Sequence, residues 1–227
     1  MDIAKTCKAQ NVPLLVDAAH AIGQVDINLR CLGNAGVCYW ISDCHKWFFT
    51  PKGCAVLWVR EDKQKCIFPV IDCATICTKG CLVKKNNDSH HLSDFEQRFT
   101  YLGTKDYTPW LSVEAAIDLV EEFGGYQALI TRNNKLAIYA QNYISHSLQT
   151  SSPNCLTSMV NLQLPKKVNS IELASDIMET LRVLYGIYLV IYEYPYQSKQ
   201  FYIRLCIQLF IEEKDIYYLH EKLLSII

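Results

Sequence analysis

Two apolar stretches that end in polar residues decide the fold: VPLLVD at residues 12–17 and VCYWISDCHK at residues 37–46. The first keeps an apolar run up to Asp17, which is typical of a strand buried on both faces of a parallel sheet. The second stays apolar through Ile41 and then turns polar. A third apolar run follows at residues 54–59, so this part of the chain is predicted to form an α/β sheet.

Apolar residues at helical or strand spacing predict the other elements. Helices are predicted at residues 2–10, 107–123, 127–148, 171–185 and 212–226, and strands at 159–164, 187–194 and 201–209. The polar stretch 73–97 is predicted to be a long surface loop. The chain is therefore expected to divide into the remaining part of a large α/β domain, residues 1–125, and a small α+β domain, residues 126–227.

The composition is that of an ordinary globular protein of 227 residues, with 50% hydrophobic and 20% charged residues. The formal net charge of −1 argues against a nucleic-acid partner and against an anionic membrane surface. The longest apolar run, residues 183–192, is too short to cross a bilayer, and the N-terminus lacks the apolar core of a signal peptide. We therefore expect a cytoplasmic protein with no membrane partner.

The 11 cysteines are scattered through apolar segments, which predicts reduced, buried thiols rather than a disulfide framework. Cys73, Cys77 and Cys81 form the one regular array, spaced by four residues. A three-cysteine metal site with His90 or His91 as a weak fourth ligand is the alternative interpretation. We expect no metal, because the sequence has no CxxC pair and cysteines in a core or loop are the commoner case.

Polar side chains gather where the first two strands end. Asp17 and His20 follow the first strand, and Ser42, His45 and Lys46 follow the second. Ligands of open α/β sheets bind at the carboxyl ends of the strands. A pyridoxal-phosphate (PLP) site needs a lysine for a Schiff base and an acid that keeps the pyridine nitrogen protonated. Each residue alone also has a commoner role, as a turn residue or a surface lysine.

The exact residues of these segments point to a protein family more specifically than their spacing does. VDAAHAIG at 16–23 and SDCHKW at 42–47, followed by PKG at 51–53, resemble the cofactor motifs of class V aminotransferases. The likeness extends to the isopenicillin N epimerase-like branch, whose Gly-Thr-x-Asp motif resembles GTKD at 103–106 and whose arginine-containing strand resembles YIRLCIQ at 202–208. This resemblance implies the C-terminal part of a type I PLP-dependent transferase fold, with a partial large-domain sheet and a small α+β C-terminal domain.

The resemblance also implies a role for each matching position around the cofactor. Lys46 would hold PLP as a Schiff base, Asp17 would face the pyridine nitrogen, and His20 would contact the phenolic oxygen of the ring. His45 and Ser42 would bind the phosphate.

Two further positions are implied to act on the substrate and on a second subunit. Arg204 would bind the substrate carboxylate, a task that suits a planar guanidinium group. Thr104 would reach the phosphate of the neighbouring subunit in a homodimer. The substrate would be an amino acid or an amino-acid derivative, and the reaction that of an epimerase, a carbon–sulfur lyase or an aminotransferase.

The chain departs from the family pattern in two places. Asp43 stands where many relatives have serine, and its carboxylate would repel a phosphate. Relatives also have a long segment ahead of the strand that ends in Asp17, and this segment carries a phosphate-binding helix N-terminus. Because the chain starts one helix before Asp17, we expect either a truncated gene model or isoform, or a natural half-enzyme. We expect this chain alone to bind PLP weakly and to be poorly soluble.

Three other functions are compatible with parts of this sequence: a cysteine desulfurase, a carbon–sulfur lyase and an inactive dimerisation partner. A cysteine desulfurase needs a nucleophilic cysteine between the last two long strands, but residues 192–202 contain none, and Cys155 and Cys206 lie elsewhere. A carbon–sulfur lyase needs no protein thiol and stays open. The alternative from a different class is a catalytically inactive, truncated PLP-fold protein that acts as a dimerisation partner. The short N-terminal part favours this alternative, and the presence of Asp17, Lys46 and Arg204 opposes it.

Overall fold

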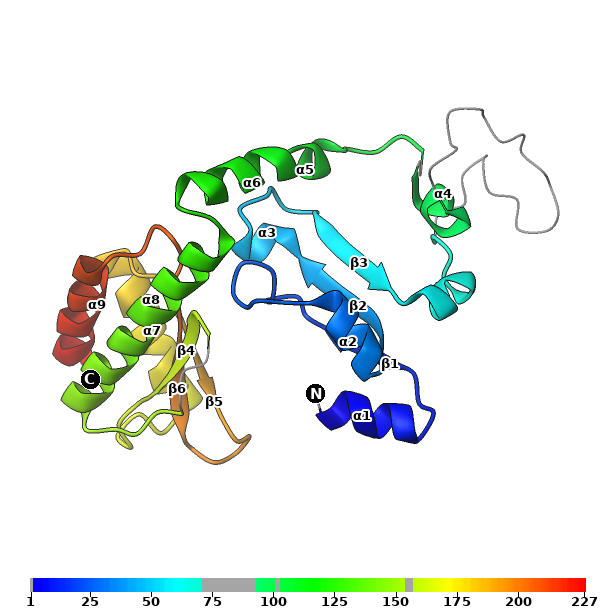
Figure 1. The fold of residues 1–227 in the computed structure, drawn as a ribbon. Coiled ribbons are helices and arrows are strands. Elements are labelled where there is room, and N and C mark those ends of the chain that lie inside the picture. The colour runs from blue at the N-terminus through cyan, green and yellow to red at the C-terminus, as the bar shows by residue number, and fades with distance from the viewer. Residues whose placement is uncertain (1, 71–92, 101–102, 154–156) are drawn as a thin grey trace. The chain divides into compact units, whose positions relative to one another are not determined.

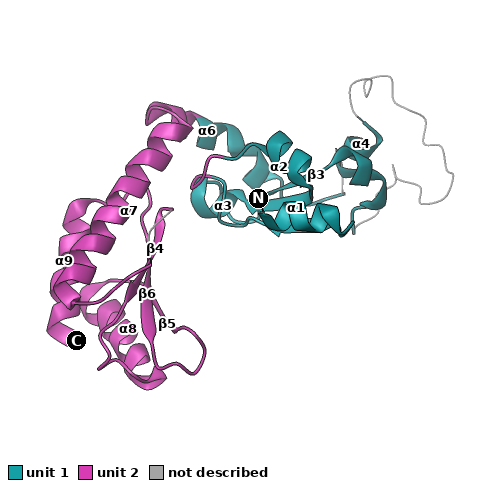
Figure 2. Ribbon diagram, turned by 60° about the horizontal axis from the view of Figure 1, so that its bottom comes forward, with its two compact units in different colours: residues 1–22, 27–117 teal, residues 23–26, 118–227 magenta. Residues whose placement is uncertain are grey.

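The structure of the chain, a computed structural model, forms two compact units (Figures 1 and 2). It describes residues 2–70, 93–100, 103–153 and 157–227. Unit 1 comprises Met1–Ile22 and Ile27–Ile117, and unit 2 comprises Gly23–Asp26 and Asp118–Ile227. The domain boundary predicted at residue 125 stays a prediction.

Unit 1 is built on a three-stranded sheet of order β1-β2-β3 (Figure 1). Its elements in chain order are α1 (Asp2–Ala9), β1 (Leu14–Asp17), α2 (Leu29–Ala35), β2 (Val37–Asp43) and β3 (Ala55–Val59). The strands β1 and β2 run parallel, with α2 in the connection between them, and β3 pairs with β2 in the antiparallel direction. The predicted α/β sheet is confirmed, and α2 is an element that the sequence did not predict.

The helix α2 is set by the residues at its two ends. The Asn28 side chain caps its N-terminus by accepting a hydrogen bond from the backbone N–H of Cys31. Gly36 follows its last residue with a φ of 121°, and a Cβ at this position would lie 2.6 Å from the backbone oxygen of Ala4 in α1. Only glycine fits this close approach, so α1 and α2 can pack together above the sheet.

One face of the unit 1 sheet is covered and the other is exposed. The covered face packs Val16 and Trp40 against α1 and α2. On the opposite face the side chains of Leu15 and Leu57 are 50% and 40% exposed. The prediction that the first strand is buried on both faces is therefore wrong for the described chain, because β1 has one strand neighbour and one covered face there.

The other elements that the structure describes in unit 1 are short helices. They are α3 (Cys44–Trp47), η1 (Glu61–Cys66), α4 (Asp94–Thr100), α5 (Thr108–Leu111) and α6 (Val113–Glu122), the last of which spans the boundary between the units. The helix predicted at residues 107–123 is thus divided at Ser112, and the loop predicted at residues 73–97 gives way to helix at its end. The cysteines and histidines of the alternative metal site lie outside the described residues.

Unit 2 is a two-layer α+β structure, which confirms the predicted class. Its elements are α7 (Tyr126–Leu148), β4 (Met159–Gln163), α8 (Ile171–Tyr185), β5 (Val190–Glu193), β6 (Phe201–Cys206) and α9 (Glu213–Ile226). The sheet is antiparallel with β6 in the centre, in the order β4-β6-β5. Residues on one face of β6, Phe201, Ile203 and Leu205, are buried in a core with residues of α7, α8 and α9.

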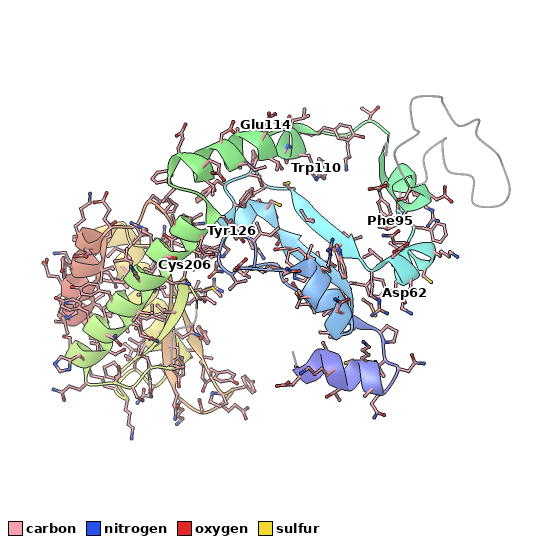
Figure 3. The ribbon with its side chains drawn as sticks, viewed as in Figure 1. Asp62, Phe95, Trp110, Glu114, Tyr126 and Cys206 are labelled. Atoms are coloured by element: carbon pink, nitrogen blue, oxygen red, sulfur yellow. The ribbon has the colours of Figure 1, made fainter. Side chains whose placement is uncertain are left out.

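A hydroxyl group ties the segment Gly23–Asp26 to unit 2. The Tyr126 hydroxyl, at the start of α7 (Figure 3), accepts a hydrogen bond from the backbone N–H of Gly23 at 2.9 Å. The same hydroxyl donates to the backbone carbonyl of Val25 at 3.1 Å. A four-residue segment early in the chain is therefore held by a residue more than a hundred positions later.

The core of unit 2 gives a first prediction. Replacing Ile203 with alanine should lower the free energy of unfolding by about 2–5 kcal/mol, because the side chain is fully buried and a cavity would remain. The same substitution at Ile171, which is 64% exposed, should change it by less than about 0.5 kcal/mol. Urea unfolding followed by far-UV circular dichroism measures both, and equal losses would contradict the assignment of the core face of β6.

Candidate functional site

Asp17 lies at the carboxyl end of β1, where the chain turns away from the sheet. Its carboxylate is exposed and accepts a hydrogen bond from the backbone N–H of Ala19 at 3.1 Å. Parallel pairing sets Asp17 beside Ile41 of β2, and the backbone N–H of Ala18 continues that pairing by donating to the Ile41 carbonyl at 2.8 Å. Since Asp43 follows Ile41 by two residues, its side chain projects from the same face of the sheet as Asp17.

Ser42 is fully buried at the end of β2. Its hydroxyl oxygen accepts a hydrogen bond of 3.2 Å from the backbone N–H of Ile22, in the loop that follows β1. The hydroxyl therefore holds this loop against the end of β2. The phosphate-binding role implied for Ser42 stays a prediction.

Lys46 lies on the short helix α3, which begins directly after β2. Its Nζ is 2.9 Å from Oδ2 of Asp43, one helical turn earlier. The hydrogen bond from Lys46 holds the pKa of the Asp43 carboxyl below its usual value, against an opposing effect of burial. The side chains of Lys46 and Asp43 are 34% and 22% exposed, so the pair is open to solvent.

His45 is held by the residue that precedes β3. Its Nδ1 lies 2.9 Å from the backbone carbonyl oxygen of Cys54, and a carbonyl can only accept, so Nδ1 carries the proton. The other ring nitrogen, Nε2, is 3.9 Å from Oδ2 of Asp43. His45 therefore faces the same carboxylate as Lys46.

His20 is bound by the residue after the lysine. The indole Nε1 of Trp47 donates a hydrogen bond of 3.1 Å to Nδ1 of His20. The loop after β1 and the helix after β2 are thus connected through side chains as well as backbone. Asp17, His20, His45 and Lys46 come from two neighbouring strand ends of unit 1, as the sequence predicted.

Thr104 lies in a turn whose neighbouring residues are held by hydrogen bonds and a cation–π contact. The Tyr107 hydroxyl donates to the carbonyl of Gly103 at 2.9 Å, and Asp106 accepts from the backbone N–H of Thr108 at 2.8 Å. The ammonium group of Lys105 lies 3.8 Å from the centroid of a Trp110 ring, and Figure 3 labels this tryptophan. Thr104 itself is exposed and makes no hydrogen bond within the described chain.

Arg204 lies on β6, in unit 2. Its neighbours Ile203 and Leu205 are buried in the core, so the side chain of Arg204 projects from the opposite face, as the alternation predicted. Its Nε is buried without a hydrogen-bond partner in the described chain, and the side chain lines a cavity of about 530 Å³.

The cysteines within the described ranges do not lie where a desulfurase nucleophile is expected. The β5–β6 hairpin has no cysteine at its tip and is closed by hydrogen bonds, among them one of 2.9 Å from the backbone N–H of Tyr194 to the carbonyl of Gln200. Cys206 is the last residue of β6 (Figure 3). Nearer to Lys46, burial and the adjacent Cys54 raise the pKa of the Cys44 thiol to about 12, so this thiol stays protonated at neutral pH.

The chain also matches a known protein family along most of its length. Residues 1–188 match the family described as aminotransferase class-V. The chain belongs to the class V aminotransferase family. The cofactor of this family is pyridoxal 5′-phosphate, and the resemblance found in the sequence is confirmed.

Three relatives illustrate the range of activities for which members of this class V family are named. The L-cysteine desulfhydrase-like protein lolT1 of Epichloe uncinata is 34% identical over 161 residues, 66% of this chain and 34% of that protein. Hercynylcysteine sulfoxide lyase of Schizosaccharomyces pombe is 27% identical over 96% of this chain and 52% of its own length. Isopenicillin N epimerase of Streptomyces clavuligerus is 24% identical over 80% and 46%. The chain spans about a third to a half of these relatives.

Solved structures show that the class V chain has the fold of type I PLP-dependent enzymes. The cystine C-S lyase C-DES, in complex with cysteine persulfide, has a TM-score of 0.71 at 20% identity. That similarity covers 93% of this chain and 52% of C-DES. The cysteine desulfurase of Thermococcus onnurineus NA1 has a TM-score of 0.70 at 18% identity, over 99% of this chain and 55% of its own.

The side chains present fit PLP in their chemistry. Asp17 offers an exposed carboxylate for a pyridine nitrogen, and Lys46 offers an amine for an aldehyde, at the ends of adjacent strands. His45 and His20 add imidazole groups at the same two strand ends. The carboxylate of Asp43, beside Lys46, has the wrong sign for a phosphate.

Two interactions of this class V site were not predicted from the sequence. The ion pair between Asp43 and Lys46 depends on α3, a helix of four residues that no periodicity could reveal. The bond from Trp47 to His20 joins residues 27 positions apart. The available signal was the tryptophan of the CHKW string itself, which had no role assigned to it.

The ion pair at Lys46 gives a prediction with a defined pH dependence. Because the pKa of Asp43 is lowered in the folded chain, its carboxylate stabilises the fold fully above about pH 5, and this contribution is lost as the pH falls through the lowered pKa. Asp43→Asn should therefore lower the free energy of unfolding at pH 7 by up to about 1 kcal/mol, the value of a partly exposed pair. The difference should shrink progressively as the pH falls below about 4.

Urea unfolding of wild type and variant at pH 7 and at pH 2.5 measures this effect. Asp118→Asn is the matched control, since Asp118 is an exposed carboxylate on α6 with no ion pair in the described chain. A loss for Asp43→Asn that is the same at pH 7 and at pH 2.5 would show that the substitution acts through packing and not through the ion pair.

Proposed function

We propose that this chain forms the lysine-bearing part of a PLP-dependent enzyme that acts on an amino acid or amino-acid derivative, with Lys46 as the residue that holds the cofactor. One observation supports this above the others. Lys46 and Asp17 lie at the ends of the parallel neighbours β1 and β2, and the β2 residue Asp43, which contacts Lys46, shares a face of the sheet with Asp17. Membership of the class V family supports it independently.

The bound cofactor would supply an electron sink for the bonds at the α-carbon of the substrate. The chain's own residues would orient that group and manage protons around it. The Asp17 carboxylate would keep the pyridine nitrogen protonated, a role supported by its exposure at the strand end. The Lys46 amine would hold the cofactor and then carry a proton to or from the substrate, as a flexible amine can.

Asp43 would set a condition on this use of Lys46. The amine must leave the carboxylate at 2.9 Å before it can bond to an aldehyde. The pair is partly exposed, so opening it costs little, about 1 kcal/mol or less. Asp43 would then remain beside His45 and could hold that ring in place while the lysine moves.

A carbon–sulfur lyase reaction is the class we favour. Two of the three relatives described above are named for cysteine desulfhydration or for cleavage of hercynylcysteine sulfoxide. Such a reaction needs no protein thiol, which agrees with a β5–β6 hairpin that has none at its tip. Epimerisation, the activity named for the third relative, and transamination would use the same lysine.

The remaining implied roles belong to this proposal as well. Thr104 would bind the phosphate of a neighbouring subunit in a cytoplasmic homodimer, supported by its exposure on an otherwise tied turn. Arg204 would bind the substrate carboxylate, supported by an Nε that has no partner in the described part of unit 2. Structurally, no helix among the described residues is long and apolar enough to cross a membrane.

Borohydride reduction tests the assignment of Lys46. The chain is incubated with excess PLP, reduced and digested, and the peptides are analysed by mass spectrometry. We expect the pyridoxyl adduct on Lys46 to exceed that on any other lysine, and Lys46→Ala to abolish it. Lys52→Ala is the control, since Lys52 is an exposed lysine six residues later and should leave the adduct unchanged.

A different distribution of the pyridoxyl adduct would contradict the assignment of Lys46. Adduct spread evenly over surface lysines, with no loss in Lys46→Ala, would contradict the proposal. If sedimentation then showed a dimer, the chain would be the inactive dimerisation partner considered from its sequence.

Arg204 gives a second test. In the PLP-loaded chain, Arg204→Gln should raise the amino-acid concentration that half-saturates the spectral change of the cofactor by about 10-fold or more, because a charge-assisted pair contributes about 1.5–3 kcal/mol. Arg182→Gln removes an exposed arginine of α8 that pairs with Glu179, and should have no effect. Equal affinities in wild type and Arg204→Gln would exclude the carboxylate role.

A further inference from the structure

The indole of Trp47 is buried beside the most exposed histidine of the site. Trp47 is 3% exposed, and its Nε1 donates to Nδ1 of His20 at 3.1 Å. A buried N–H group needs an acceptor, and an indole N–H can only donate. Turning the His20 ring away would therefore leave a buried donor unsatisfied, which is costly compared with an ordinary side-chain rotation.

This bond determines where His20 carries its proton. Nδ1 must present a lone pair to the indole, and a neutral imidazole has one N–H group. The proton of neutral His20 is therefore on Nε2. His45, the residue before Lys46, has the opposite arrangement, because its Nδ1 donates to the carbonyl of Cys54.

The backbone around His20 leaves little freedom to undo this arrangement. On one side, the N–H of Ala18 donates to Ile41 at 2.8 Å and the carbonyl of Ala19 accepts from Asp43 at 3.3 Å. On the other side, the N–H of Ile22 donates to the Ser42 hydroxyl at 3.2 Å. The ring is thus fixed by its own hydrogen bond on a loop that is held to β2 at both ends.

We infer that Trp47 is a positioning residue that fixes His20 as the Nε2–H tautomer, so that the histidine acts at this site as a hydrogen-bond donor and not as a base through Nδ1. The inference rests on the proposed function where it concerns the cofactor. There, the Nε2–H would be offered to the phenolic oxygen of PLP and would favour its anionic form. The tautomer itself is a property of the chain without cofactor.

Imidazole nitrogen chemical shifts test the inference on the full chain without PLP. In two-bond 1H–15N spectra at pH 8, the His20 Nδ1 signal should have the shift of an unprotonated nitrogen and Nε2 that of a protonated one. His45 should show the reverse pattern in the same spectrum. His20→Gln and His45→Gln assign the two rings.

The matched variants are Trp47→Phe and Trp40→Phe, since both tryptophans are 3% exposed and lie in unit 1. Trp47→Phe should reduce the tautomer ratio of His20 by about fivefold, the effect of one ordinary hydrogen bond. Trp40→Phe should leave it unchanged, which separates a specific bond from a general loss of packing.

The wild-type spectrum alone can overturn the inference, so it does not depend on the folding of any variant. A His20 ring with its proton on Nδ1, or with averaged shifts that Trp47→Phe does not alter, would show that Trp47 does not fix the tautomer. Adding PLP separates this question from the proposed function. Failure to bind at Lys46 would refute the latter and leave the tautomer result standing.

Discussion

The site depends on hydrogen bonds that connect the loop after β1 to the end of β2. Three backbone N–H groups make this connection: Ala18 to the Ile41 carbonyl, Asp43 to the Ala19 carbonyl, and Ile22 to the Ser42 hydroxyl. The parallel pairing of two strands is thereby extended into the segments that carry functional side chains. Without it, an acid and a lysine separated by 29 residues of sequence would have no fixed relation.

Side-chain contacts add to these backbone hydrogen bonds at the same two strand ends. Asp43, His45 and Lys46 interact through a single short helix, so the charge at this strand end is partly neutralised within the chain. Trp47, the residue after the lysine, points inward and binds His20. Neighbouring residues of α3 therefore differ in exposure: Lys46 is exposed to solvent, and the buried Trp47 holds the other loop.

Much of this could be predicted from the sequence, and the reasons are local. Apolar runs marked the strands, the polar residues after them marked the site, and the alternation around Arg204 followed from strand geometry. The direction of β3 could not be predicted, because an apolar run of five residues is the same in either direction. Neither could the partners of Asp43 and Trp47, since a four-residue helix has no periodicity and a contact across 27 residues leaves no pattern in one sequence.

The two hydrogen bonds of the Tyr126 hydroxyl also bear on the order in which parts of the chain can fold during synthesis. Gly23 and Val25 leave the ribosome about a hundred residues before the hydroxyl that binds them. At about 5–20 residues per second, this segment waits roughly 5–20 seconds with its amide and carbonyl bonded only to water. During that interval β1 and β2 are both already synthesised, so the paired strand ends can form first. The later arrival of α7 then closes a loop whose neighbouring residues are already in place.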